Sequence, residues 1–223
     1  QIIEKYAFYS TNIDEILIPS SVIKICQRAF SKCYNLIRVE IPTNSKLQSI
    51  EKYAFSSSKI EELYFPTSLN ELMEGWCSET KKLRKIIISP LNDKLIFIDD
   101  KYLLGKSCEN KDEFDILLFA SRNIKDISIP SKVTKICESA FEHCIKITRV
   151  EIPKNSNLQI IGKNAFSYSS IKYIYIPSKV IQIGEHAFCE CLNFLIIEIS
   201  EESKLQSLSK LAFDKCKNLI IMI

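Results

Sequence analysis

The chain has 223 residues, of which 46% are hydrophobic and 26% charged, an ordinary composition for a soluble folded protein. Its net charge of +3 is too small to indicate a nucleic-acid partner, and no apolar run approaches the roughly 20 residues that span a bilayer. The chain has four glycines and seven prolines. This argues against long flexible linkers and against a fold that needs many tight glycine turns.

The dipeptide Ala-Phe recurs along the chain and marks an internal repeat. It occurs at Ala7-Phe8, Ala29-Phe30, Ala54-Phe55, Ala140-Phe141, Ala165-Phe166, Ala187-Phe188 and Ala212-Phe213, and Trp76-Cys77 fills the same position once. The steps between these anchors are 22, 25, 22, 64, 25, 22 and 25 residues. Short and long units therefore alternate. Corresponding pairs of units begin at Ser20 and Ser131, and they agree at 24 of 41 aligned positions.

Each anchor is followed by a segment of the form L-x-x-L-x-L-P. Such segments are Ile13–Pro19, Leu36–Pro42, Ile60–Pro66, Ile124–Pro130, Ile147–Pro153 and Ile171–Pro177. Alternating apolar and β-branched residues predict a short strand with one buried face, and the proline ends it. An apolar residue also lies four positions before each Ala, as Ile25 and Ile161 do. For Ala-Phe itself we expect a single helical or 3₁₀ turn that carries both side chains inward.

Units of this kind bury their apolar faces only by stacking, which is the principle of a solenoid. The period of 22 to 25 residues and the L-x-x-L-x-L core match a leucine-rich repeat. The Ala-Phe and L-x-L-P features resemble the BspA-like class of leucine-rich repeats. We therefore expect one leucine-rich-repeat domain over residues 1–223, a β-rich solenoid of the α/β horseshoe class with about nine turns. The pattern departs from this class at Trp76-Cys77, at Ser89-Pro90 and at Ser200.

The step of 64 residues contains an extra block over residues 91–123. Its apolar runs Leu95–Ile98, Tyr102–Leu104 and Phe114–Phe119 predict an inserted β-hairpin or small meander, and BspA-like proteins often carry such an insert. Its acidic residues are Glu109, Asp112, Glu113 and Asp115. They lack the ligand order and sharp-turn glycine of a calcium loop, so a solvated hairpin tip is the preferred interpretation.

The sequence carries no motif that predicts catalysis or cofactor binding. The two histidines, His143 and His186, lie at different offsets from Ala-Phe and are expected on surface loops. His186 with Cys189 and Cys191 suggests a metal site, but a structural zinc site needs four ligands and no second pair is nearby. We predict no catalytic, cofactor or metal site, and no enzymatic activity.

The nine cysteines form an odd set that cannot all pair within the chain. Cys33, Cys144, Cys191 and Cys216 share one position relative to the anchor, and Cys26 and Cys137 share another. Recurrence in register indicates a packing role, because cysteine behaves as a small buried hydrophobe. Cys191 and Cys216 lie on adjacent turns, yet stacked parallel side chains disfavour a bond. We expect free thiols, which favour a reducing compartment.

Outward-facing strand positions form two columns on the concave face. One column is Glu15, Arg38, Glu62, Lys85, Asp126, Arg149, Tyr173 and Ile196, and the other is Leu17, Glu40, Tyr64, Ile87, Ser128, Glu151, Tyr175 and Glu198. The first half alternates in charge, as a solvated face does. Tyrosine and arginine are favoured in binding hot spots, so the candidate protein-binding residues are Tyr64, Ile87, Arg149, Tyr173, Tyr175 and Ile196. The alternative is that large β-formers merely cover the sheet.

Two functional hypotheses follow. The resemblance implies a cell-surface adhesin that binds host extracellular-matrix proteins or other cells. The alternative is a cytoplasmic scaffold built on the same repeats, which the free thiols and the missing glycosylation sequons favour. An enzyme with its site in the insert has only the acidic stretch in support. Because both ends of the chain fall inside the repeat without polar caps, we also expect self-association through open repeat ends.

Overall fold

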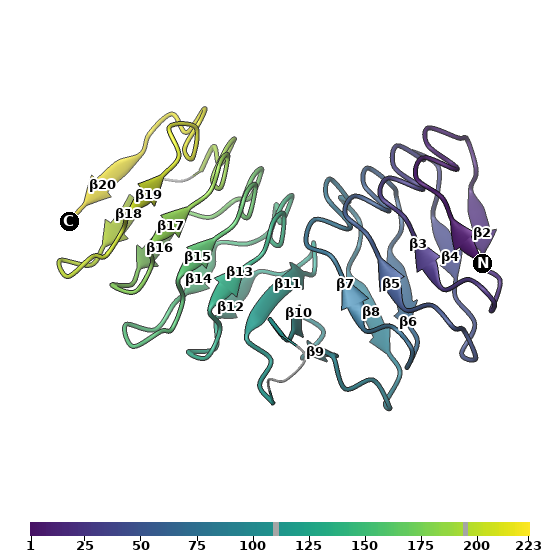
Figure 1. Cartoon of the computed structure of the whole chain (residues 1–223). Coiled ribbons are helices and arrows are strands. Elements are labelled where there is room, and N and C mark those ends of the chain that lie inside the picture. The colour runs from purple at the N-terminus through teal and green to yellow at the C-terminus, as the bar shows by residue number, and fades with distance from the viewer. Residues whose placement is uncertain (109–111, 194–195) are drawn as a thin grey trace. The chain divides into compact units, whose positions relative to one another are not determined.

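The computed structural model describes residues 1–108, 112–193 and 196–223. The chain forms two compact units, Gln1–Gly105 and Lys106–Ile223. Within each unit the chain winds through successive turns, and each turn adds a short strand to a parallel sheet (Figure 1). The predicted solenoid is therefore confirmed, while a single domain over residues 1–223 stays a prediction. In the described residues no helix has the length and apolar character needed to cross a membrane.

The first unit has two sets of strands. The L-x-x-L-x-L segments form β2 (Glu15–Leu17), β4 (Arg38–Glu40), β6 (Glu62–Phe65) and β8 (Lys85–Ile88). The apolar residues before the anchors form β1 (Ile2–Ile3), β3 (Lys24–Ile25), β5 (Ser49–Ile50) and β7 (Glu71–Leu72). The second set makes one parallel sheet in the order β1-β3-β5-β7, while β2 pairs with β4 and β6 with β8.

The second unit repeats this plan. Its L-x-x-L-x-L strands are β12 (Asp126–Ser128), β14 (Arg149–Glu151), β16 (Tyr173–Ile176), β18 (Ile196–Ile199) and β20 (Ile220–Met222). The other set is β11 (Ile116–Ala120), β13 (Lys135–Ile136), β15 (Ile160–Ile161), β17 (Gln182–Ile183) and β19 (Ser207–Leu208). All of these pairs are parallel, as in β16 and β18, where Ile174 lies opposite Ile197.

The predicted hairpin is present at the end of the first unit. Strand β9 (Leu95–Ile98) pairs antiparallel with β10 (Tyr102–Gly105), and Ile98 lies opposite Tyr102. The tip is the tight turn at Asp99 and Asp100, whose φ angles of 51° and 53° are typical of hairpin turns. The acidic stretch lies in the next connection along the chain, and its assignment to a hairpin tip stays a prediction. Of that stretch, Asp112, Glu113 and Asp115 belong to the segment between β10 and β11, and Glu109 lies outside the described residues.

The anchor phenylalanines form a stacked core in each unit. In the second unit Phe141, Phe166, Phe188 and Phe213 follow one another with ring centroids 4.7, 5.2 and 5.3 Å apart and nearly parallel planes. In the first unit Phe8, Phe30 and Phe55 stack in the same way. Trp76 closes that stack with its ring edge-on to Phe55, so the irregular Trp-Cys anchor still supplies an aromatic core residue.

The Ala-Phe segments are hydrogen-bonded turns, not the helical or 3₁₀ turns that the sequence predicts. In each such turn, residues beside the anchor adopt a left-handed backbone: Asn164 and Tyr168, for example, have φ angles of 52° and 58°. The turns are therefore tight although glycine is scarce. Sixteen non-glycine residues in the described parts of the chain have positive φ, a conformation usually left to glycine.

Hydrogen bonds between successive turns explain why this strained backbone persists. The N–H groups of Asn164, Phe166 and Tyr168 donate to the carbonyls of Glu185, Ala187 and Cys189 at 3.0, 2.7 and 2.9 Å. We call this repeated set of bonds the turn ladder. A left-handed residue costs about 1–2 kcal/mol, whereas a buried donor left unpaired costs about 1–3 kcal/mol. The ladder offsets the strain, and side chains other than glycine are tolerated.

The recurring cysteines serve the same turns. The thiols of Cys33, Cys191 and Cys216 donate to the carbonyls of Phe8, Phe166 and Phe188 in the preceding turn at 2.9, 3.0 and 3.0 Å. All nine cysteines are free. Burial raises the pKa of the Cys191 thiol to about 12, so this group stays protonated and remains a donor at neutral pH. The prediction of free thiols in packing positions is confirmed.

Replacing Phe166 by alanine tests the aromatic core. Phe166 is fully buried between two stacked rings, and removal of a buried Phe typically costs about 3–5 kcal/mol. We expect Phe166→Ala to lower the free energy of unfolding by that amount in urea titrations. Ile145→Ala, at a side chain that is 64% exposed, is the control and should change it by less than about 0.5 kcal/mol. Equal effects of the two changes would contradict the stacked core.

Substitutions at Ser57 test the backbone strain of these turns separately from the hydrogen bonds of the side chain. Its φ is 60°, and its hydroxyl bonds Glu79 at 2.6 Å. Ser57→Val and Ser57→Gly both lose that bond, so the difference between them isolates the backbone. We expect the valine variant to be less stable than the glycine variant by about 1–2 kcal/mol, measured by chemical denaturation. A valine variant as stable as the glycine variant would show that this backbone is not strained.

Candidate protein-binding face

Three of the predicted binding residues lie together on β16 and β18 of the second unit. The two strands pair in parallel, with Tyr173 opposite Ile196 and Tyr175 opposite Glu198. Their alternate residues Ile174, Ile176 and Ile197 are fully buried. The opposite face therefore presents Tyr173, which is 41% exposed, and the half-buried Tyr175 and Ile196. The register predicted from the sequence brings these three residues together.

A carboxylate that was outside the predicted site anchors this cluster. The Tyr173 hydroxyl donates to Glu198 Oε2 at 2.7 Å. Burial, followed by this hydrogen bond and the Glu198 charge, raises the pKa of Tyr173 to about 12. The phenol is thus neutral and held in one orientation at physiological pH. The sequence analysis already placed Glu198 beside Tyr175 in the second outward-facing column. That position is the sequence feature from which its contact with the tyrosine cluster could have been predicted.

Arg149 lies on the neighbouring strand β14, which is next to β16 (Figure 1). Its side chain is 73% exposed and forms an ion pair with Glu151 at 3.3 Å. Such an exposed pair contributes little to stability, so the guanidinium remains available to a partner. The second unit thus combines tyrosines, an aliphatic residue and an arginine on adjacent strands.

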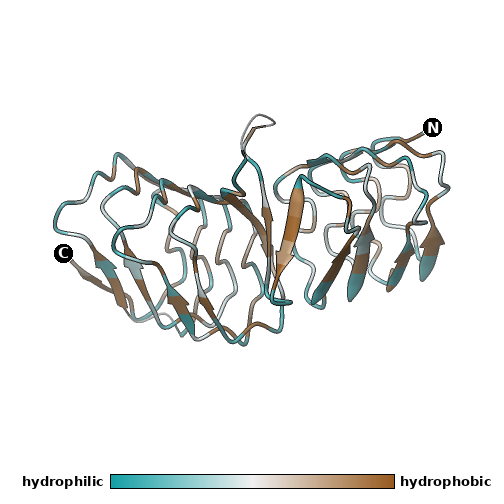
Figure 2. Cartoon of the chain, turned by 90° about the horizontal axis from the view of Figure 1, so that it is seen from below, coloured by the Kyte–Doolittle hydropathy of each residue, from teal (hydrophilic) through white to brown (hydrophobic). Residues whose placement is uncertain are grey.

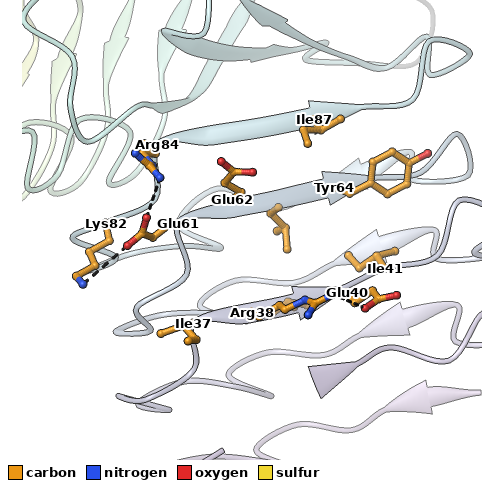
Figure 3. Close-up of a pocket in the computed structure, with 12 residues that line it drawn as sticks. Ile37, Arg38, Glu40, Ile41, Glu61, Glu62, Tyr64, Lys82, Arg84 and Ile87 are labelled. Atoms are coloured by element: carbon orange, nitrogen blue, oxygen red, sulfur yellow. Dashed lines mark hydrogen bonds and ion pairs between the residues drawn. The ribbon is translucent and has the colours of Figure 1, made fainter. Parts of the chain in front are cut away.

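The remaining predicted residues, Tyr64 and Ile87, face each other on β6 and β8 of the first unit. They line a shallow hollow of about 820 Å³ on the sheet face, and Figure 3 shows both side chains beside it. Ile87 is 43% exposed and Tyr64 is half-buried. Figure 2 shows that single strands carry both hydrophobic and hydrophilic residues, as expected for sheets with one buried face.

Charged residues that the sequence columns missed form one side of this hollow. Glu61 forms ion pairs with Arg84 at 3.0 Å and Lys82 at 3.9 Å (Figure 3). These three residues precede the strands, so a count of outward strand positions does not include them. Across the hollow, Arg38 pairs with Glu40 at 3.1 Å and with Glu15 at 3.8 Å. The first unit therefore offers a more highly charged face than the second.

The acidic stretch has a structural role at Asp115. Its side chain is buried, and it accepts hydrogen bonds from the N–H and hydroxyl of Ser107, both at 2.8 Å, and from the Thr134 hydroxyl at 3.2 Å. These bonds fix the start of the second unit. Asp112 and Glu113 are exposed, in keeping with the solvated interpretation.

Comparison with known proteins identifies the family. A model described as BspA type leucine rich repeat region matches residues 1–109 and 113–223 in six copies. The chain belongs to this family of repeat proteins, and the resemblance seen in the sequence is confirmed. No curated protein is similar enough to match the chain.

Several solved structures share the fold. A leucine rich cell surface protein from Faecalibacterium prausnitzii is 23% identical with a TM-score of 0.71, over 94% of this chain and 59% of that one. The pneumococcal vaccine antigen PcpA is 19% identical with a TM-score of 0.75, over 92% and 60%. A leucine-rich repeat protein from Bacteroides ovatus is 21% identical with a TM-score of 0.59, over 99% and 58%. The chain thus spans about three fifths of the length of each.

Spectrophotometric titration tests the Tyr173–Glu198 contact. Because the folded-state pKa of Tyr173 is raised from 10.0 to about 12, its contribution to stability is complete below pH 10 and is lost as the pH rises towards 12. The difference between the titrations of the native chain and Tyr173→Phe should show one phenol that ionises near pH 12. Glu198→Gln should lower that pKa part of the way, since burial remains. If Tyr173 titrated at the ordinary tyrosine pKa in both the native chain and Glu198→Gln, the Tyr173–Glu198 contact would be contradicted.

Proposed function

We propose that the chain is a non-catalytic protein-binding module of a cell-surface protein, and that it binds host extracellular matrix or other cells through its sheet face. The observation that carries this proposal is the exposure of Tyr173 beside Tyr175 and Ile196 on a rigid pair of strands. The buried face of those strands already supplies the packing that the fold needs. The outward residues are therefore available for a partner.

The chemistry of this face suits a protein ligand. Tyrosine presents a large amphipathic surface with few rotatable bonds, so its immobilisation costs little entropy. Tyr173 is also oriented beforehand by its bond to Glu198, which lowers the cost of binding further. Arg149 on the adjacent strand supplies a planar cation for carboxylates of a partner. Aromatic and arginine anchors on a flat, partly polar face are typical of binding hot spots.

The comparisons support a location on the cell surface. One solved structure of the same fold is described as a leucine rich cell surface protein and another as a pneumococcal vaccine antigen. Both descriptions concern those proteins, and sequence identities of 23% and 19% establish only the shared fold. Family membership and these neighbours together favour the adhesin over other uses of the repeat.

The second candidate is a cytoplasmic scaffold for protein–protein interaction, favoured by the nine free cysteines, since unpaired thiols are typical of reducing compartments. Antibodies against this chain, applied to cells of the source organism, separate the two candidates. Staining of intact, unpermeabilised cells supports the adhesin. Staining only after permeabilisation would replace it with the scaffold.

A double substitution tests the binding face. We expect Tyr173→Ala with Tyr175→Ala to abolish adhesion to a panel of immobilised extracellular-matrix proteins, because a tyrosine hot spot contributes at least about 2 kcal/mol, roughly thirtyfold in affinity. Far-UV circular dichroism should be unchanged. The matched control is Tyr9→Ala with Tyr34→Ala, which removes two exposed tyrosines from turns outside the strands and should leave adhesion intact. Adhesion that survives in the folded Tyr173/Tyr175 variant would exclude this face.

A further inference from the structure

Three side chains of metal-ligating type meet at one edge of the second unit. His186, Cys189 and Asp214 each offer a ligand atom, and these atoms all lie within 4.8 Å of one another. Cys189 Sγ is 3.8 Å from Asp214 Oδ2. Cys189 is buried, while His186 and Asp214 are half-buried. The site is thus partly shielded from water but open on one side.

The turn ladder fixes this cluster. Cys189 follows Phe188, and Asp214 follows Phe213, so the two residues occupy the same position in consecutive turns. The N–H of Phe188 donates to the carbonyl of Ala212 at 2.8 Å, and that of Glu190 to the carbonyl of Asp214 at 3.0 Å. Hydrogen bonds on both sides therefore hold the thiol and the carboxylate side by side. This arrangement is independent of the binding face on β16 and β18.

One ring nitrogen of the histidine is free to accept a metal ion. His186 Nδ1 is buried and has no hydrogen-bond partner in the described structure, although a buried polar atom normally has one. The other ring nitrogen, Nε2, lies 3.8 Å from Glu185 Oε1. If Nε2 carries the proton and turns it towards this carboxylate, the Nδ1 lone pair is left free, an arrangement common in metal sites. Glu185 is itself held by Lys163.

We propose that His186 Nδ1, Cys189 Sγ and the Asp214 carboxylate bind a zinc ion, with the fourth position left to water. Zinc accepts nitrogen, thiolate and carboxylate ligands at about 2.0–2.3 Å in tetrahedral geometry, which places ligand atoms roughly 3.5 Å apart. The Cys189–Asp214 separation of 3.8 Å is already close to this value, and the other pairs, within 4.8 Å, would contract on binding. A thiolate and an imidazole select zinc over the hard cations calcium and magnesium.

Zinc binding has a defined proton balance and a structural consequence. The Cys189 thiol releases its proton to solvent as the zinc–sulfur bond forms, and the Asp214 carboxylate compensates part of the ion's charge. Because two ligands lie on one turn and the third on the next, the ion cross-links successive turns. An ion that binds only the folded chain raises its stability by mass action.

Cobalt and zinc titrations of the reduced full chain test the proposal. The background is Cys108→Ser, which removes an exposed thiol. With Co²⁺ alone we expect one equivalent to produce a thiolate-to-cobalt charge-transfer band and the visible bands of tetrahedral cobalt, and Zn²⁺ should displace them. Zinc at 100 times its Kd should raise Tm by roughly 5–10 °C. The absence of a thiolate band in the folded chain would overturn the proposal without any variant.

Ligand variants locate the site. Cys189→Ser and Asp214→Asn preserve shape, and His186→Asn suits the positive φ of 56° at that position. Cys189→Ser should abolish the charge-transfer band, and each of the other two should weaken binding at least tenfold. The matched control is Cys137→Ser, which removes a buried thiol from another turn and should leave binding unchanged. Equal binding by the folded ligand variants and the control would show that the metal binds elsewhere, which would contradict the proposal.

Discussion

The hydrogen bonds that join each Ala-Phe turn to the next are the interaction on which the structure depends. Pairing between strands joins successive turns over only two to four residues. By itself this pairing would leave the backbone around the anchor without hydrogen-bond partners. The turn ladder supplies those partners from N–H groups such as those of Asn164, Phe166 and Tyr168. It requires a left-handed backbone beside the anchor, and that requirement explains why the anchor region is neither a strand nor a helix.

The side chains of the turn follow from this backbone. Alanine and phenylalanine point inward, so the small residue leaves room for the ring and the rings stack between turns. Cysteine, serine or threonine follows three residues after the phenylalanine, where Cys33, Cys191 and Cys216 donate to a carbonyl of the preceding turn. These three thiols are therefore structural hydrogen-bond donors.

Much of the fold could be predicted from the sequence, because the regular spacing of apolar residues reveals the repeat. The strand positions, the stacked phenylalanines and the register that places Tyr173 opposite Ile196 all follow from aligning the units. The left-handed turns could not be predicted in this way, since residues such as Tyr168 carry no local signal for positive φ and it is the hydrogen bond to the next turn that stabilises it.

The candidate sites show the same division. Tyr173, Tyr175 and Ile196 were found because they alternate with buried residues, whereas Lys82 and Arg84 were missed because they precede the strand. The sequence also singled out His186, Cys189 and Cys191 as a metal-ligating group with too few ligands for a structural zinc site. Asp214 joins His186 and Cys189 in the proposed site only when consecutive turns are superposed, which places it in the same position as Cys189. The sequence of a single unit therefore does not reveal the interactions between neighbouring turns.

Native-state hydrogen exchange of the free chain tests the turn ladder most directly. The amides of Asn164, Phe166 and Tyr168 lie outside the strands but donate to the next turn. They should exchange as slowly as the strand amides of Ile160 and Ile161, because both sets open only when the turns separate. Rapid exchange at the three turn amides beside protected strands would contradict the account, since the turns would then be ordinary loops.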